Sequence, residues 1–272
     1  MTEAKHGPRT ELVDFAADLA RGAGDLIRSA AFDKGEATTK SSAADWVTPI
    51  DRSVEAWLRE AITARYPGHA IVGEELGVTP GAHEAAHAWH IDPIDGTTNF
   101  LHGLGNVAVS IAVVDHTGPV AAAVQDVYRG QTITAARGHG VHLDGTPQKP
   151  VVAEDLAGNV LLTEWSGHRA WDGMDSFLRW ATDRTATVRI LGSCALALAS
   201  AGLGRAPVCI LPGRYNSWDV AAGLLIATEG GLSVRGRHDE TEPVPQDGLL
   251  VAPSALIDDV RDAWLEAAEA LT

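Results

Sequence analysis

A series of short apolar runs between residues 107 and 143 restricts the fold of this chain more than any other feature. The runs VAVSIAVV, VAAAVQDVY, TITAA and VHL are separated by the turn-forming sequences HTGP, RGQ and RGHG, and a DG turn follows the last run. Consecutive strands joined by tight turns pair as an antiparallel meander. The sequence therefore predicts an antiparallel sheet in the first half of the chain.

After residue 159 the pattern changes to strands that alternate with helices. The predicted strands are residues 160–164, 187–190, 208–211 and 248–252, and the predicted helices are residues 173–182, 193–201, 218–229 and 255–270. Such alternation indicates a mixed or parallel sheet covered by helices. We expect one α/β domain over residues 1–272, with an antiparallel half over about 10–150, an alternating half over about 151–272, and the seam near 145–159.

Two amphipathic helices are predicted before the meander. The first covers residues 11–31, where Leu12, Phe15 and Leu19 recur at helical spacing. The second follows Thr48, which is a suitable N-cap; a proline occupies the first helical position and Asp51 lies in the first turn.

The composition excludes several classes of partner. The 36 acidic residues outnumber the 21 basic residues and give a net charge of −15, so we expect no nucleic-acid partner. The N-terminal segment has no apolar leader and no run approaches the length of a membrane span, which predicts a cytoplasmic protein without a membrane partner. Cys194 and Cys209 are too few for a disulfide framework, and their apolar neighbours predict buried structural thiols.

The sequence HEAAH at residues 83–87 has the form of the zinc-protease motif H-E-x-x-H. That motif needs both histidines on one face of a stable helix and a third ligand downstream. Pro80 and Gly81 precede it, Pro93 follows soon after, and few apolar residues are available to hold such a helix against a core. We therefore interpret HEAAH as a polar surface loop.

A second group of acids is better placed for chemistry, because its members end strands or begin helices. They are Asp51, Glu74, Glu75, Asp92, Asp95 and Asp219. Mg²⁺ prefers oxygen ligands, typically a few carboxylates completed by water and substrate phosphate. Because Pro93 fixes one backbone angle, Asp92, Asp95 and the Ile94 carbonyl can converge. The following amides, those of Gly96, Thr97 and Thr98, are expected to accept phosphate oxygens.

With these motifs the chain resembles the inositol monophosphatases of the lithium-sensitive, magnesium-dependent phosphatase superfamily. The matching stretches are KSSAADWVTPID (40–51), GEE (73–75), DPIDGTTNF (92–100), WDVAAG (218–223) and EGG (229–231). The resemblance extends from about Lys40 to the C-terminus. It implies the αβαβα five-layer sandwich of the inositol monophosphatase and fructose-1,6-bisphosphatase type, and by analogy a homodimer.

The resemblance also implies roles for individual residues. Glu74, Asp92 and the Ile94 carbonyl would hold one Mg²⁺, while Asp92, Asp95 and Asp219 would hold a second. Asp51, Thr97 and Glu74 occupy the positions at which the family activates the attacking water, where a weaker third ion can join. Two such ions stabilise the attacking and leaving oxygens of an in-line displacement, without a phosphoenzyme.

The resemblance is weakest where the substrate is selected. Inositol-specific members carry a glutamate seven residues before the W-D aspartate, and this chain has Pro212 there, which accepts no side-chain hydrogen bond. Arg214 adds a cation that the family pattern does not predict. Gly192, Ser193 and Cys194 align with the loop beside the sugar, and Asp95, Asp219 and Arg214 complete the expected substrate contacts.

Three functions therefore remain open at this stage. The first is hydrolysis of a small polyol phosphate, with inositol 1-phosphate as the default substrate. The second is hydrolysis of histidinol phosphate or another small phosphate monoester. The third is a non-enzymatic, regulatory role with RNA-linked machinery, against which the acidic charge counts.

Overall fold

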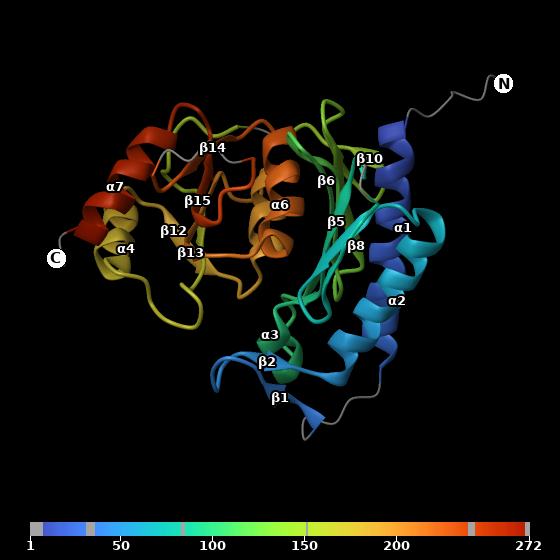
Figure 1. Ribbon diagram of the computed structural model, residues 1–272. Helices are drawn as coiled ribbons and strands as arrows, with labels where there is room; N and C mark the ends of the chain where they lie inside the picture. Colours follow the sequence, from blue (N-terminus) through green and yellow to red (C-terminus); the bar gives the residue numbers. More distant parts are fainter. Residues whose placement is uncertain (1–7, 31–35, 83–84, 151, 239–242, 270–272) are drawn as a thin grey trace.

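A computed structural model of the chain describes residues 8–30, 36–82, 85–150, 152–238 and 243–269. Five layers follow one another across the molecule: helices, a sheet, helices, a second sheet and helices (Figure 1). The helices are α1 Pro8–Ser29, α2 Pro49–Arg65, α3 Thr97–His102, α4 Met174–Asp183, α5 Cys194–Gly202, α6 Ser217–Glu229 and α7 Ile257–Glu269. The predicted αβαβα layering is confirmed.

The first sheet has eight strands in the order β10-β9-β8-β7-β6-β5-β3-β4. Its strands are β3 Ala70–Gly73, β4 Gly77–Thr79, β5 Ala88–Asp95, β6 Ala108–Asp115, β7 Gly118–Asp126, β8 Gln131–Ala136, β9 Val141–Leu143 and β10 Thr146–Pro147. From β6 to β9 every neighbouring pair is antiparallel, as the meander predicted. The pairs β5–β6, β9–β10 and β3–β4 are antiparallel too, and β3 and β5 pair in parallel. The helices α1 and α2 cover one face, and α5 and α6 cover the other.

The second sheet has five strands in the order β12-β11-β13-β15-β14. Its strands are β11 Val160–Thr163, β12 Thr187–Ile190, β13 Val208–Arg214, β14 Ser233–Gly236 and β15 Asp247–Ala252. The pairs β11–β12 and β11–β13 are parallel while β13–β15 and β14–β15 are antiparallel, so this is the mixed sheet that alternation indicated. The helices α5 and α6 pack between the sheets, and α4 and α7 cover the outer face.

The start of α2 shows how the local sequence sets the position of a predicted site residue. Thr48 is the N-cap and its hydroxyl accepts hydrogen bonds from the amides of Ile50 and Asp51, while the Asp51 carboxylate accepts from the Thr48 amide at 2.9 Å. This reciprocal capping box stabilises the first turn. It also turns the Asp51 side chain inward, where it is fully buried.

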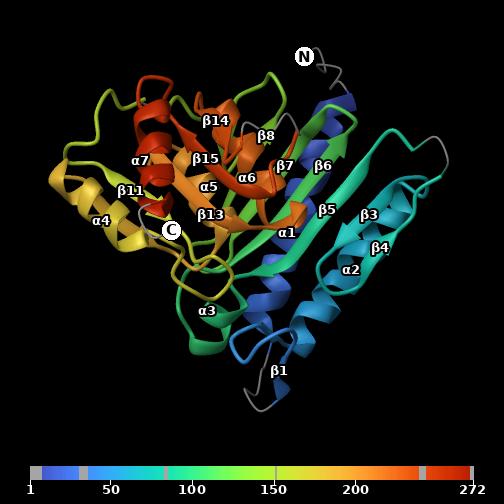
Figure 2. The same cartoon turned by 60° about the vertical axis from the view of Figure 1, so that its left-hand side comes forward.

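Other segments were not predicted. The hairpin of β1 Thr38–Thr39 and β2 Trp46–Val47 and the short helix α3 lie together at one end of the molecule (Figure 2).

His83 and Glu84 of the HEAAH sequence lie outside the described residues, and residues 85–87 are not helical. No helix in the described part of the chain is long and apolar enough to cross a membrane.

Candidate active site

A pocket of about 590 Å³ lies where the ends of β5 and β13 meet the starts of α3 and α6. Most of the predicted site residues line it. They are Glu74, Asp92, Ile94, Asp95, Gly96, Thr97, Thr98, Gly192, Cys194, Arg214 and Asp219. Two predicted residues lie behind this surface: Asp51 is fully buried, and Ser193 is 1% exposed.

Asp92 and Asp95 are brought together by an irregularity in the strand that carries them. The register of β5 against β6 shifts between Asp92 and Asp95, and the Ile94 amide donates to Asp92 Oδ1 at 2.9 Å. Asp95 Oδ2 accepts from the Ser193 hydroxyl at 2.6 Å and from the Ala195 amide at 2.7 Å, at the start of α5. Asp95 thus connects the two halves of the chain, and the Ser193 hydroxyl is engaged in positioning it.

Glu74 lies in the tight connection between β3 and β4. Behind it, the fully buried Glu55 of α2 accepts hydrogen bonds from the amides of Glu75 at 2.7 Å and Leu76 at 3.1 Å, and pairs with Arg59 at 2.7 Å. Charged acceptors bound to backbone amides fix a turn more firmly than neutral ones. Glu55 therefore positions Glu74, although the sequence did not identify it as a site residue.

Asp219 begins α6 and is fixed by the helix terminus itself. Its Oδ2 accepts from the Asn216 amide at 2.8 Å in a capping box. Two contacts from the first sheet support this terminus: the Ser110 hydroxyl donates to the Trp218 carbonyl at 2.9 Å, and His90 Nδ1 lies 2.6 Å from the Ser217 hydroxyl. These contacts hold Trp218 and Asp219, at the start of α6, against β5 and β6.

Thr97 links the buried Asp51 to the pocket. Its hydroxyl lies 3.2 Å from Asp51 Oδ1 and 3.0 Å from the Ile94 carbonyl oxygen, both acceptors. A hydroxyl has one proton to donate, so it serves one acceptor at a time and keeps its lone pairs for a donor such as water. Asp51 accordingly reaches the pocket through Thr97.

The backbone between β5 and α3 has little room. Gly96 has φ +95°, and a Cβ there would lie 2.8 Å from the Asn106 carbonyl oxygen and 3.0 Å from that of Gly192. The Asn99 side-chain amide donates to the Asn106 and Leu191 carbonyls at 2.8 Å each. Glycine at 96 therefore lets the two halves of the chain approach closely beside the expected phosphate site.

The carboxylates of the pocket repel one another. Burial raises the pKa of Asp92, and the negative charges of Glu74, Asp95 and Asp219 raise it further. Burial, followed by the charge of Asp95, likewise raises the pKa of Asp219 to about 8. A cation is already in contact with this group, since Lys40 Nζ lies 2.7 Å from Glu74 Oε1 and 2.6 Å from Glu75 Oε1.

This donor set fits a hard divalent cation. All the groups are oxygen donors, namely carboxylates, the Ile94 carbonyl and the Thr97 hydroxyl, and their excess negative charge calls for a cation. Among the described residues, no three histidine, cysteine, aspartate or glutamate side chains already form a metal-binding group.

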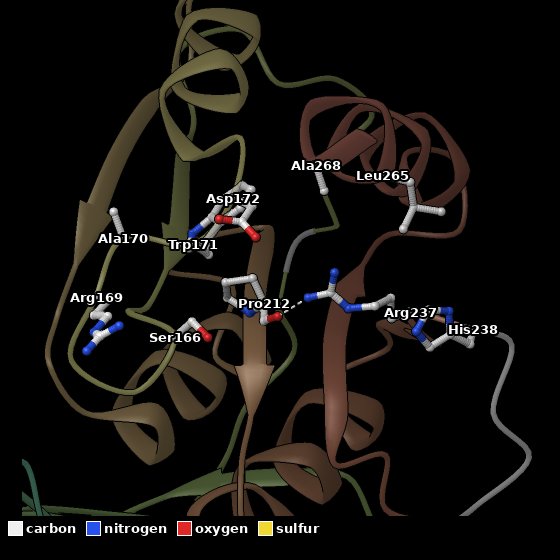
Figure 3. A pocket seen from close by; sticks show the side chains of 10 residues that line it. All are labelled: Ser166, Arg169, Ala170, Trp171, Asp172, Pro212, Arg237, His238, Leu265 and Ala268. Carbon is white, nitrogen blue, oxygen red and sulfur yellow. Dashed lines mark hydrogen bonds between the residues drawn. The ribbon is translucent and has the colours of Figure 1, made fainter. Parts of the chain in front are cut away.

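Arg214 and Pro212 line different cavities. Arg214 lines the carboxylate pocket with 86% of its side chain exposed, and it pairs with Asp247 across 3.5 Å. Pro212 instead lines a separate cavity of about 510 Å³ behind the pocket wall, where its carbonyl accepts from Arg237 (Figure 3). Position 212 therefore does not face the carboxylate pocket at all.

Sequence reasoning missed several residues that shape the pocket. Glu164 is 3% exposed and accepts from the amides of Leu191 at 3.0 Å and Gly192 at 3.0 Å, so it positions the glycine-led loop. The other lining residues that were missed include Lys40, Asp45, Trp46, Trp165, His168 and Tyr215. A glutamate that ends a strand, TE at 163–164, was the one available signal.

Cys194 also departs from its prediction in part. Cys209 is buried, as predicted, whereas Cys194 is half-buried and lines the pocket. Burial and the nearby charge of Asp95 raise the pKa of the Cys194 thiol. The thiol therefore stays protonated near neutral pH and is a poor nucleophile.

Comparison with known proteins identifies the family. The profile of the inositol monophosphatase family matches residues 9–268. The Nus factor SuhB of Pseudomonas aeruginosa is 37% identical over 240 residues, 85% of this chain and 88% of that protein. The inositol monophosphatase of Mesembryanthemum crystallinum is 32% identical over 233 residues, 84% and 86% of the two chains.

Solved structures agree with this result. The IMPase of Thermotoga maritima has a TM-score of 0.84 at 28% identity and covers 96% of this chain and 100% of its own. The structure of SaIMPase-II with bound 2′-AMP has a TM-score of 0.76 at 26% identity, with 96% and 97% covered. The chain belongs to the inositol monophosphatase family and is a phosphoric monoester hydrolase.

Proposed function

We propose that this protein is a Mg²⁺-dependent phosphomonoesterase that hydrolyses a small polyol phosphate, with inositol 1-phosphate as the first candidate. The observation that carries the proposal is the gathering of Glu74, Asp92, Asp95 and Asp219 in one pocket from separate strand ends and helix starts. Members of the family are in general metal-dependent, which supports the assignment.

The metal ligands are assigned from the family resemblance, and the donor set is compatible with them. Glu74, Asp92 and the Ile94 carbonyl would hold one Mg²⁺, and Asp92, Asp95 and Asp219 a second; a weaker third ion would join at Asp51, Thr97 and Glu74. Bound Mg²⁺ supplies Lewis-acid stabilisation of phosphoryl oxygens and makes water more acidic. Lys40 must give up its contact with Glu74 when a cation binds there.

The protein groups around the metal ligands orient the reactants. Asp51 Oδ1 accepts from the Thr97 hydroxyl. By the family resemblance, the Thr97 oxygen would accept a hydrogen bond from the attacking water, and Glu74 would receive the proton of that water. The amides of Gly96, Thr97 and Thr98 are assigned to the phosphate oxygens. Asp95, Asp219, Arg214 and the Gly192–Cys194 loop are assigned to the alcohol.

A second substrate remains in competition. Because Pro212 faces away from the pocket, no side chain at this position grips the hydroxyls of an inositol ring. Histidinol phosphate or another small monoester is therefore the alternative. Lithium sensitivity, a homodimer and a cytoplasmic location remain predictions.

A non-enzymatic role is also worth testing, because the Pseudomonas aeruginosa relative is named a Nus factor. The net charge of −15 counts against direct contact with RNA. Retention of transcription components by the purified protein at physiological salt would support this role.

Phosphate release from inositol 1-phosphate and L-histidinol phosphate, measured side by side with and without Mg²⁺, tests the enzymatic proposal. We expect turnover that requires Mg²⁺ and falls at least 100-fold in Asp95→Asn. Preference for histidinol phosphate would replace the first substrate with the second. Absence of Mg²⁺-dependent release from any monoester would refute the proposal.

A further inference from the structure

Part of the pocket wall is aromatic and cationic rather than acidic. Trp165 has 42% of its surface exposed, and Trp46 is half-buried; both line the same pocket as the metal-binding carboxylates. Arg214 lies on this wall as well. Its pairing with Asp247 spans 3.5 Å between exposed groups, and such pairs are weak, so the guanidinium is free to turn toward a ligand.

The Trp165 indole is displayed from a fixed backbone. The Tyr215 hydroxyl donates to the Trp165 carbonyl at 2.9 Å, and the next residue, Ser166, pairs with Arg169 and packs against Gly213. Because the backbone is already held in place, binding a ligand against the exposed indole requires no ordering of this segment. Tyr215 thus ties Trp165 to the strand that carries Arg214.

Trp165 also lies next to the region expected to bind the phosphate. Its neighbour Glu164 holds the Gly192 amide at 3.0 Å, and the Gly192 carbonyl abuts Gly96 at the start of α3. The alcohol of a phosphate ester bound near Gly96 would lie in the same pocket as Trp165 and Arg214. Indole and guanidinium are both planar groups that stack on flat, electron-rich rings.

We infer that Trp165 and Arg214 are specificity-determining residues that select monoesters whose alcohol carries a planar heteroaromatic ring. This inference rests on the proposed phosphomonoesterase, and it favours a ring-bearing alcohol over inositol as the leaving group. Trp165 supplies a stacking surface for the ring, and Arg214 covers the ring or donates to its acceptor nitrogens. The ring has two possible sources, a nucleoside or an imidazole alcohol, and both share this chemistry.

The experiment measures kcat/KM with four monoesters on matched variants. The ring-bearing esters are 2′-AMP and L-histidinol phosphate, and the ring-free esters are inositol 1-phosphate and glycerol 2-phosphate. The variants are Trp165→Ala, Trp165→Phe and Tyr128→Ala. Tyr128 is the control, an aromatic residue of similar exposure, 46%, that is outside the pocket lining. Calorimetric binding of 2′-AMP to wild type and Trp165→Ala adds a readout that does not need turnover.

We expect Trp165→Ala to lower kcat/KM for at least one ring-bearing ester by about tenfold, the usual loss when a stacking aromatic is removed. The ring-free esters should change less than twofold, Trp165→Phe should recover most of the loss, and Tyr128→Ala should match wild type. The ester that loses more identifies the source of the ring. Weaker 2′-AMP binding in Trp165→Ala should accompany a 2′-AMP loss.

Two results would overturn the inference. Equal losses on all four esters, especially with a change in oligomeric mass, would make Trp165 a structural or subunit contact. Unchanged kcat/KM and unchanged 2′-AMP binding would make the indole irrelevant while the phosphatase stands. Conversely, 2′-AMP binding that depends on Trp165, without hydrolysis of any ester, would support Trp165 as a ring-binding residue and refute the proposed function.

Discussion

Replacing Glu55 by glutamine tests whether Glu55 holds the β3–β4 connection that carries Glu74. The two Glu55 oxygens accept the amides of Glu75 and Leu76 and the Arg59 side chain, all within 3.1 Å, and Glu55 is fully buried. Glutamine keeps one acceptor oxygen and turns the other position into a donor. At least one buried amide then loses its partner, at about 1–3 kcal/mol.

The charge change adds to this loss. The Arg59 guanidinium is 12% exposed, and breaking a buried ion pair from one side costs about 3–5 kcal/mol. Because the two effects share atoms they do not add fully, and we expect a total destabilisation of about 3 kcal/mol. Loss of support behind Glu74 should also weaken Mg²⁺ activation on the order of tenfold, as outer-shell changes do.

Urea unfolding followed by tryptophan fluorescence measures the first effect, and Mg²⁺ titration of phosphate release measures the second. Glu60→Gln is the matched control, because it makes the same change on the exposed face of the same helix. Identical unfolding midpoints for both variants would refute the stability argument. A destabilised Glu55→Gln with normal Mg²⁺ activation would show that Glu55 supports the fold without positioning Glu74.

Three further predictions concern separate parts of the molecule. Gly96→Ala should lower the free energy of unfolding by about 1–3 kcal/mol, because Gly96 has a positive φ and a Cβ there would lie 2.8 Å from a backbone oxygen. Gly105→Ala is the control, because a Cβ at Gly105 meets no atom within 4 Å and should leave the free energy of unfolding unchanged. Urea unfolding midpoints of both variants measure the difference. Glu164→Gln should release the Gly192 loop and lower kcat/KM for every monoester on the order of tenfold, as measured by phosphate release. Burial opposes ionisation of Asp115, but hydrogen bonds from a hydroxyl and from Arg137 outweigh it and lower its pKa to about 2. Its stabilising effect is therefore present above about pH 4 and lost as pH falls toward 2; Asp115→Asn should destabilise the protein at pH 6 and not at pH 2, in denaturant titrations at both values.

Much of the fold could be predicted from local sequence patterns. The turns between residues 107 and 143 and the capping residues at Thr48 produce structure within a few residues of themselves, so the antiparallel order and the start of α2 agree with prediction. The helix α3 was missed because six residues carry too little periodicity to be recognised. The parallel pairing of β3 with β5 depends on long-range contacts that one sequence does not reveal.

In the candidate site, too, residues with local signals were predicted and residues that act through distant segments were missed. The acids at strand ends and helix starts were identifiable because their positions are local signals; Glu74, Asp92, Asp95 and Asp219 line one pocket, whereas Asp51 and Glu75 do not. Glu55 and Glu164 act through backbone amides of segments far away in the chain. No local pattern marks Glu55, and only its position at the end of a strand marks Glu164. Pro212 faces the outer side of the second sheet, as Ile210 does two residues earlier, while Leu211 between them packs toward α5 and α6; counting back from Asp219 could not show this.

The central claim is that the clustered carboxylates bind the Mg²⁺ on which hydrolysis depends. Mg²⁺ titration of phosphate release, for wild type and Asp219→Asn, tests it most directly. We expect saturable activation of wild type from near-zero activity in chelator, with Asp219→Asn at least 100-fold less active or requiring far more Mg²⁺. Equal activity in chelator, or an Asp219→Asn curve that overlays wild type, would contradict it.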